Sequence, residues 1–407
     1  MRKCRFCEST ELRGVLDLGF HPPSNAFLTR EQMERGYPVS PLRLYVCEEC
    51  FLVQIDESVP VSDIFTDNYV YYSSESPANV THAKAYCDMM LERFPNIKHV
   101  LEIGSNDGYM LQHFKERGCR VMGIDPATGP AAIANKKGIP TVIAFFNAKN
   151  AAMSVGVADL ICGINVLNHQ SNINDFVEGL KIALAPEGII TFEFPHLSQM
   201  IEKCEWDTIY HEHLNYYSLF TIMQIFSENG LFIFDVDEIP EHGGSLRIYA
   251  RHAEEELLQF PPTLKLQILL QKELDAGVNT AAYYRNFAAK VNESRERIRQ
   301  FIDYVHEYDM TVMIYGAAAK ANTLLNYCGL TSADIKYAAD RSPHKIGKYM
   351  PGSHVPVVSP DEIANIRPNY VLITAWNLKD EIMEQLKFIR EWNGKFVIPI
   401  PSLEVLL

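Results

Sequence analysis

The sequence predicts an α/β protein in which a small cysteine-containing module precedes two doubly wound units. Short apolar runs alternate with helical patterns over about residues 69–252, and the alternation resumes from about residue 308 to the end. This alternation is typical of a mostly parallel sheet with helices on both faces. Two Cys-x-x-Cys pairs stand in the first fifty residues. At roughly 100–200 residues per domain, the 407 residues predict two or three domains.

The expected division is a cysteine module over residues 1–68, a first α/β domain over 69–252, and a helical linker with a second α/β domain over 253–407. Residues 253–305 are predicted to be mostly helical, because charged side chains gather on one face. Apolar runs bounded by turn residues predict the other elements. The first unit has strands at 100–103, 120–124, 141–144, 158–164, 188–194, 231–236 and 245–251, with a helix at 108–116; the second has strands at 311–315, 335–340, 370–374 and 396–400, with helices at 318–327 and 379–391.

The overall charge argues against a nucleic-acid partner. The formal net charge is −14, and no long run of Lys and Arg occurs, whereas a nucleic-acid binder usually carries a basic face. No signal-peptide pattern and no stretch of about 18 apolar residues occurs. We therefore expect a cytoplasmic protein that does not bind a membrane.

Four of the nine cysteines form two pairs that predict a structural zinc site. Each Cys-x-x-Cys turn presents two sulfurs on one side of a loop, and two such turns complete a tetrahedral Cys₄ site with no open position. The alternative is two unrelated thiol pairs. A thioredoxin-like motif would need a strand–helix context, which neither pair has. The predicted ligands are Cys4, Cys7, Cys47 and Cys50.

A glycine turn after the first strand of the 69–252 unit predicts a ligand loop. Gly104 lets the backbone approach a ligand, Glu102 is expected beneath the turn, and Asn106 and Asp107 lie within it. Asp125 ends the second strand, where a carboxylate can accept both ribose hydroxyls of a nucleoside. The Glu-x-Gly-x-x-x-Gly pattern followed by this Asp resembles class I S-adenosylmethionine methyltransferases. The alternative is a nicotinamide-binding fold, although Gly-x-Gly-x-x-Gly is missing.

Residues after the third and fourth strands extend this predicted donor site. Phe146 and Asn147 are placed to flank an adenine, although the aromatic ring is equally consistent with an ordinary core position. Asn165 ends the fourth strand, where the methionine end of the donor is expected.

A polar and aromatic segment, residues 207–213, follows the fifth strand and predicts acid–base chemistry. Methyl transfer to carbon requires a base for a proton next to a ketone and a donor for the enolate oxygen. His213, Glu212 and Tyr210 supply such groups, and His169 lies on a second loop. A metal bound by His211 and His213 is an alternative, as is a purely structural loop.

The Cys pairs, the Glu-Ile-Gly-Ser-Asn-Asp-Gly loop, Tyr-His-Glu-His-Leu and Gly-Gly-Ser-Leu-Arg together resemble the nucleotide-sugar C-methyltransferases over essentially the whole chain. These enzymes modify keto-deoxy sugars. The resemblance implies a zinc-binding domain, a class I methyltransferase domain and a C-terminal Rossmann-like domain, with S-adenosylmethionine and structural Zn²⁺. It implies methylation of a nucleoside-diphosphate 4-keto sugar at C-3, with a monomer or weak oligomer permitted.

The same resemblance implies roles for particular residues. His213 becomes the base, supported by Glu212 and Tyr210, with His169 as the runner-up. Tyr71 or Tyr72 closes the pocket, and the sequence does not decide between them.

The C-terminal unit opens with a strand, a glycine turn and a helix, which in this family resembles a degenerate nucleotide-binding loop. A helix N-terminus suits a phosphate. The residues expected to hold the sugar nucleotide are Gly316, Lys320, Asn322 and Ser342. The alternative is an inherited scaffold without a ligand.

Two other functions remain open from the sequence. One is a zinc-module methyltransferase that acts on RNA, protein or another small molecule, against which the acidic charge argues. The other is a binding module without catalysis, against which the segment from Tyr210 to His213 argues.

Overall fold

The central sheet has the strands that the apolar runs predict. In the computed structural model, which describes residues 2–65, 69, 71–253 and 261–407, it has the order β10-β11-β8-β7-β4-β5-β6. The five strands from β8 to β6 are parallel, and β11 and β10 are antiparallel to their neighbours. The strands are β4 (His99–Ile103), β5 (Arg120–Asp125), β6 (Thr141–Ile143), β7 (Ala158–Ile164), β8 (Leu184–Pro195), β10 (Leu231–Ile239) and β11 (Ser245–His252).

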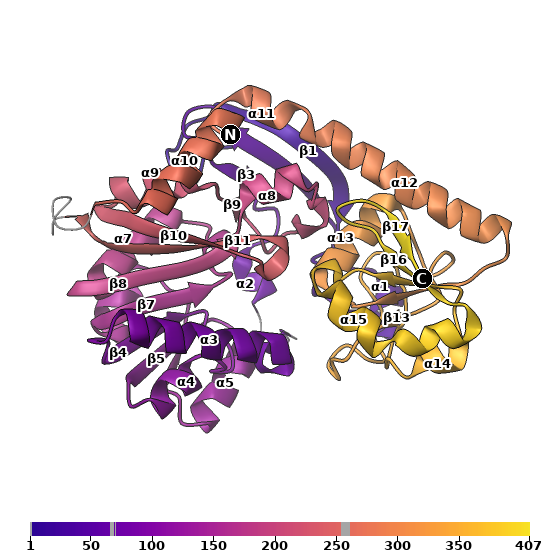
Figure 1. Cartoon of the computed structure of the whole chain (residues 1–407), viewed down its shortest axis with the longest axis horizontal. Helices are drawn as coiled ribbons and strands as arrows, with labels where there is room; N and C mark the ends of the chain where they lie inside the picture. Colours follow the sequence, from indigo (N-terminus) through magenta and orange to yellow (C-terminus); the bar gives the residue numbers. More distant parts are fainter. Residues whose placement is uncertain (1, 66–68, 70, 254–260) are drawn as a thin grey trace.

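Helices cover both faces of this sheet (Figure 1). One hydrophobic cluster joins it to α3 and α4, and another joins it to α7, α9 and α10. The predicted helix at 108–116 begins only at Leu111, because Asn106 and Gly108 have positive φ angles of 48° and 79°. The helices are α3 (Pro77–Arg93), α4 (Leu111–Glu116), α5 (Thr128–Lys136), α6 (Ala148–Asn150), α7 (Ile173–Ala183), α8 (Leu197–Glu202), α9 (Leu219–Glu228) and α10 (Leu264–Ala276).

The C-terminal sheet has the order β14-β13-β12-β15-β16-β17 and is parallel except for β17. The strand predicted at 335–340 shortens to two residues, because only these pair with β12. The helix predicted at 379–391 breaks into α15 and a 3-10 turn, Lys387–Trp392. The elements are α11 (Ala281–Arg285), α12 (Phe287–Glu307), β12 (Val312–Tyr315), α13 (Ala319–Cys328), β13 (Ala338–Ala339), β14 (Val357–Val358), α14 (Glu362–Ile366), β15 (Tyr370–Ile373), α15 (Lys379–Gln385), β16 (Lys395–Ile398) and β17 (Glu404–Leu406).

The N-terminal module contains an antiparallel sheet that the sequence pattern did not predict. Its strands are β1 (Leu12–His21), β2 (Ser40–Cys47) and β3 (Val53–Ile55), with the short helices α1 (Arg30–Arg35) and α2 (Val61–Ile64) beside them. The fourth strand, β9 (Asn215–Tyr216), comes from the central part of the chain. The module and the central unit therefore share one sheet.

One hydrophobic cluster runs from the N-terminal sheet into the C-terminal unit. It contains Leu42 and Leu44 of β2, Phe287 and Val291 of α12, and Leu324 of α13. Figure 1 shows β1 and α12 extending together toward the C-terminal unit. By contrast, the cysteine end of the module packs with the central sheet. The module thus joins both α/β units. Within the described part of the chain, no helix has the length and apolar character needed to cross a membrane.

The four paired cysteines come together at one end of the N-terminal sheet. Their Sγ atoms all lie within 4.8 Å of one another, with Cys4–Cys50 and Cys7–Cys47 at 3.5 Å. A zinc–sulfur distance of about 2.3 Å places tetrahedral sulfurs about 3.8 Å apart, so this set fits a closed Cys₄ zinc site. Such a site stabilises the module and leaves no position for a substrate.

We expect Cys47→Ser to lose nearly all bound zinc and to lower the thermal midpoint, because zinc binding contributes about 10–16 kcal/mol in small modules of this kind. Metal content by plasma mass spectrometry and unfolding by circular dichroism test this. Cys119→Ser, a buried thiol outside the cluster, is the control. One zinc retained per Cys47→Ser chain would contradict the assignment.

Candidate active site

One cavity of about 1200 Å³ lies between the central and C-terminal units. It is lined at the carboxyl ends of β4, β5, β7 and β8 and, across from them, at the carboxyl ends of β12, β13 and β15. The crevice at the carboxyl ends of parallel strands is the usual ligand position in such sheets. Pockets for one small ligand span about 300–1000 Å³, so this cavity has room for two.

The β4 turn brings the backbone to the cavity wall. Gly104 has φ +70°, and a Cβ there would meet Val166 Cγ1 at 2.2 Å. Asp125 accepts backbone N–H bonds from Asn106 at 2.9 Å and Ala127 at 2.8 Å. Burial raises the pKa of Asp125 to about 6, although these two N–H donors lower it. Gly104, Asn106 and Asp125 all line the cavity, and this close backbone approach with an acidic strand end fits a nucleoside ligand.

Glu102 and Asp107 do not line the cavity. Glu102 is buried, and burial raises its pKa well above the ordinary value although the backbone N–H of Leu111 lowers it. Asp107 accepts from the Ser74 hydroxyl and from Lys137. Both residues therefore lie behind the loop, away from the cavity. For Asp107 this differs from the expectation that it lies in the ligand-binding part of the turn.

The other predicted donor residues do line the cavity. Phe146 also packs edge-on against Phe176, with ring centroids 5.3 Å apart, so it serves the core as well. The Asn147 side chain caps α6 through Asn150 N at 2.8 Å. Asn165 has φ +56°, and its Oδ1 is buried with no donor in the described structure. An unpaired buried acceptor at the end of β7 suits a ligand N–H or ammonium group.

Tyr210 and His213 form a hydrogen-bonded pair at the cavity wall. Tyr210 OH and His213 Nε2 are 2.7 Å apart, and the His169 ring lies 5.3 Å from that of His213. Burial lowers the pKa of His213 well below its ordinary value and that of His169 to about 4. Both imidazoles are thus neutral near pH 7, the protonation state that a general base needs.

Glu212 also lines the cavity, but His211 turns away from it. Glu212 Oε1 accepts from Asn25 Nδ2 at 2.7 Å, and burial raises the pKa of Glu212 to about 7. His211 Nε2 instead faces the Pro41 carbonyl at 3.3 Å. His211 and His213 therefore do not converge on one centre, and among the described residues only the Cys set groups three or more metal ligands.

Both candidate tyrosines line the cavity. Tyr72 stacks on His344 of the C-terminal unit, with centroids 4.7 Å apart, and so reaches across the cavity. The Tyr71 hydroxyl accepts from Asn79 Nδ2 at 3.0 Å on the near side. The segment that carries them is held by Asn106, whose side chain binds Tyr71 O and Ser73 N.

Three of the four expected sugar-nucleotide residues line the cavity: Gly316, Lys320 and Ser342. Lys320 Nζ lies 4.0 Å from the Trp376 ring centroid, and burial lowers its pKa. The Ser342 hydroxyl is buried and has no partner in the described chain. Asn322 is the exception, because its buried amide donates to the Ser24 carbonyl and lies outside the lining.

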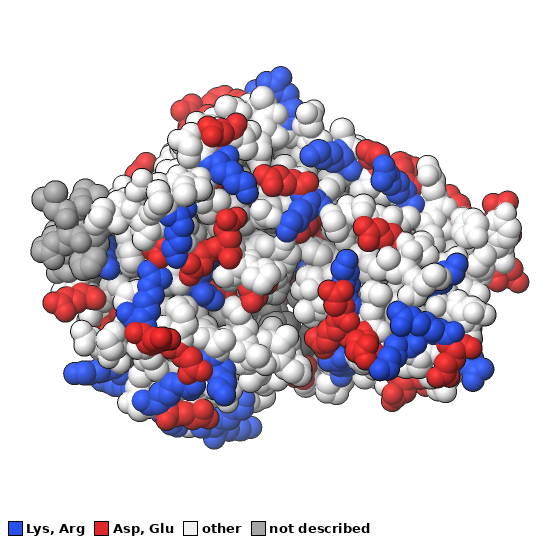
Figure 2. Space-filling view, viewed as in Figure 1, with Lys and Arg blue, Asp and Glu red and all other residues white. Residues whose placement is uncertain are grey.

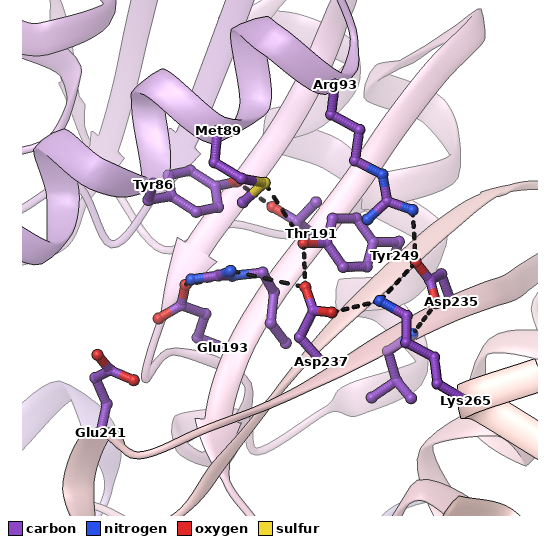
Figure 3. A network of polar contacts seen from close by, with 12 residues as sticks. Tyr86, Met89, Arg93, Thr191, Glu193, Asp235, Asp237, Glu241, Tyr249 and Lys265 are labelled. Carbon is purple, nitrogen blue, oxygen red and sulfur yellow. Dashed lines mark hydrogen bonds and ion pairs between the residues drawn. The ribbon is translucent and has the colours of Figure 1, made fainter. Parts of the chain in front are cut away.

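Sequence reasoning missed a charged network along the β8 end. His82 on α3 binds Glu193 at 2.6 Å and Glu241 at 2.9 Å. Glu193 also pairs with Arg247 at 2.7 Å. Figure 3 shows Glu193 and Glu241 at one end of this network, which continues through Asp237 to Asp235, Arg93 and Lys265. Glu193 lies near the end of the apolar strand β8. The only sequence signal for the charged network was this one Glu between two Phe residues.

Comparison with known proteins gives a consistent result. Three family models match, described as "Putative zinc binding domain" (residues 4–65), "Methyltransferase domain" (81–235) and "C-methyltransferase C-terminal domain" (240–401). The C-methyltransferase NovU from Streptomyces niveus is 32% identical to this chain, over 99% of this chain and 96% of that protein.

Solved structures also resemble parts of this chain. The magnesium protoporphyrin IX methyltransferase of Synechocystis PCC 6803, with bound SAM, is 14% identical with a TM-score of 0.33, over 42% of this chain and 78% of that chain. The PH0226 protein of Pyrococcus horikoshii is 11% identical with a TM-score of 0.39, over 45% and 95%.

We expect Gly104→Ala to weaken S-adenosylmethionine binding about tenfold or more, because the added methyl overlaps Val166 and overpacking costs about 1–3 kcal/mol. Isothermal titration calorimetry measures this. Gly118→Ala is the matched control: Gly118 has φ +86° but no atom within 4 Å of the added carbon. Equal affinities for both variants would place the donor elsewhere.

His82 generates a pH-dependent contribution to stability. Burial alone lowers its pKa, but hydrogen bonds and charges from Glu193 and Glu241 outweigh this and raise the pKa to about 9. The stabilisation is complete below about pH 6.5 and is lost as the pH rises through about 9. We expect the difference in unfolding free energy between wild type and His82→Gln to shrink over that window in urea titrations. A constant difference would show that His82 stays neutral.

Proposed function

Since the chain belongs to the C-methyltransferase family and is an S-adenosylmethionine-dependent enzyme, we propose that its acceptor is C-3 of a nucleoside-diphosphate-linked 4-keto deoxysugar. The observation that carries this proposal is that one cavity is lined by two different α/β units. The loop proposed to hold the donor lines one wall, Lys320 and Lys345 line the other, and the Tyr210–His213 pair lines the same space.

The neutral imidazole suits proton removal from a carbon next to a ketone. His213 has a hydrogen bond to the backbone of Thr208, which places its hydrogen on the nitrogen facing that carbonyl and leaves Nε2 as the unprotonated nitrogen that accepts from Tyr210. His213 Nε2 takes the C-3 proton, and the electron pair moves onto the ketone oxygen. When bound, S-adenosylmethionine supplies an electrophilic methyl group for the resulting carbon nucleophile.

Tyr210 is placed to stabilise the oxyanion. Its hydroxyl donates to His213 Nε2 in the free protein. When the substrate binds, the hydroxyl turns to its ketone oxygen, which frees the Nε2 lone pair for the C-3 proton and keeps the hydroxyl on the enolate oxygen as it forms. Burial raises the pKa of Tyr210 well above its ordinary value, so it remains a hydrogen-bond donor.

The C-terminal wall suits a diphosphate. Lys320 lies in the first turn of α13, where helix N–H groups favour an anion. Lys345 Nζ and the unpaired Ser342 hydroxyl belong to the neighbouring loop. On the molecular face in Figure 2, Lys and Arg are intermixed with Asp and Glu, without the basic area that an RNA substrate would favour.

We expect wild type to convert one member of a panel of nucleoside-diphosphate 4-keto-6-deoxy sugars into a product heavier by one CH₂ unit. His213→Asn should reduce the rate by about 10²–10⁴-fold, because it removes the base. Mass spectrometry of the products measures both. His211→Asn is the matched control, since its imidazole faces Pro41 outside the cavity.

Exchange of the C-3 hydrogen in D₂O, measured with S-adenosylhomocysteine in place of the donor, isolates the proton step. The exchange should be lost in His213→Asn and retained in His211→Asn. Exchange that survives His213→Asn but not His169→Asn would move the base to His169. No methylated product from any sugar, with donor binding intact, would refute the acceptor.

A further inference from the structure

A segment of the N-terminal module enters the cavity. Residues 22–26, Pro-Pro-Ser-Asn-Ala, follow β1, and Asn25 is part of the cavity lining. Its Nδ2 donates to Glu212 Oε1 at 2.7 Å. This contact joins a residue of the zinc-binding module to a carboxylate next to His213.

We propose that Asn25 is a positioning residue for Glu212: its carboxamide holds one carboxylate oxygen, keeps the group ionised and fixes its orientation in the cavity. The inference rests on the proposed function, because it assigns Glu212 a part in that reaction. It gives the N-terminal module a role in the chemical step beyond stabilising the fold.

The backbone around Asn25 is anchored on both sides. The Ser24 carbonyl accepts from the Asn322 amide of α13. Leu28 and Tyr349 exchange two backbone hydrogen bonds of 2.9 Å. The backbone on either side of Asn25 is therefore held by the C-terminal unit while its carboxamide contacts a residue of the central unit, so the carboxamide needs little reordering to bind Glu212.

Glu212 depends on this contact because it is buried. It is 4% exposed, and within the described chain Asn25 is its one hydrogen-bond donor. The groups that face it are Lys345 from the C-terminal unit and the hydroxyls of Tyr69 and Tyr210. Burial raises the pKa of Glu212 to about 7, while Asn25 and Lys345 lower it. Removing the Asn25 donor therefore favours the protonated carboxyl.

The ionised form of Glu212 is the one that helps the proposed reaction. His213 becomes an imidazolium when it takes the substrate proton, and an ionised carboxylate that lines the same cavity stabilises that charge. A protonated carboxyl does not. We therefore expect kcat/KM to fall on the acidic side with a midpoint near the Glu212 pKa of about 7.

The test is the pH profile of kcat/KM in Asn25→Ala and Asn25→Asp. In both, the acidic midpoint should move up by about one unit or more, and further for Asp, because two adjacent carboxylates share a proton. At pH near 7 a one-unit shift corresponds to a loss of about fivefold that is largely recovered at high pH. A Glu212→Gln background should abolish the shift.

Asn174→Ala is the matched control, because its amide also joins the module to the central unit, through Phe6 O at 2.8 Å, but outside the cavity. Its profile should match wild type. A pH-independent loss in the Asn25 variants, with the midpoint unmoved, would overturn the proposal.

A second measurement needs no turnover. Infrared difference spectroscopy follows the protonated carboxyl band of Glu212, assigned by its absence in Glu212→Gln. Its titration should shift upward in Asn25→Ala and stay in place in Asn174→Ala. An unshifted band would overturn the inference. If no sugar is methylated by wild type, the proposed function fails, and this titration still decides whether Asn25 controls Glu212.

Discussion

The apolar contact between the N-terminal sheet and the C-terminal unit determines the rest of the structure. Leu42 and Leu44 belong to the same buried cluster as Phe287 of α12 and Leu324 of α13. Each such side chain, when fully buried, contributes about 1.5–3 kcal/mol. Because the cysteine end of the same module packs on the central sheet, the two parallel sheets are held with their carboxyl ends toward one cavity. A site whose two walls come from different units requires that the units keep a fixed separation.

Burial within that cavity assigns opposite protonation states to its groups. His213 and His169 have few charged partners, so desolvation leaves them neutral. His82 lies between Glu193 and Glu241 and keeps its proton, because two carboxylates outweigh the same desolvation. Glu212 falls between these cases, since it is buried like the first pair and has one amide donor. The same buried environment thus gives a neutral base, His213, a cation, His82, and a carboxylate whose pKa depends on one amide donor, Glu212.

The sequence predicted what depends on neighbours in the chain. Apolar runs located the strands of the central sheet and four of the C-terminal sheet, but missed β14 and β17. The glycine turn at Gly104 together with Asp125 indicated the donor loop, of which Gly104, Asn106 and Asp125 line the cavity. The N-terminal strands were not predicted, and the strand that completes their sheet, β9, comes from the central part of the chain. Asn25 gave no local signal, and its partner lies in a remote loop. Asn322 follows the glycine turn, where a ligand contact is expected, but in the folded chain its amide donates to the Ser24 carbonyl.

The pairing of β3 with β9 also affects how the chain acquires its shape during synthesis. Val53 leaves the ribosome long before its partner Tyr216. Until then the first three strands have an open edge, and the surface that will meet α12 and α13 is bare. Metal capture by the first fifty residues can protect this unfinished intermediate, since a small module without its ligand ion is largely unfolded. The cysteine cluster thus completes its ligand set within the first fifty residues, before the strand that closes its sheet has been made.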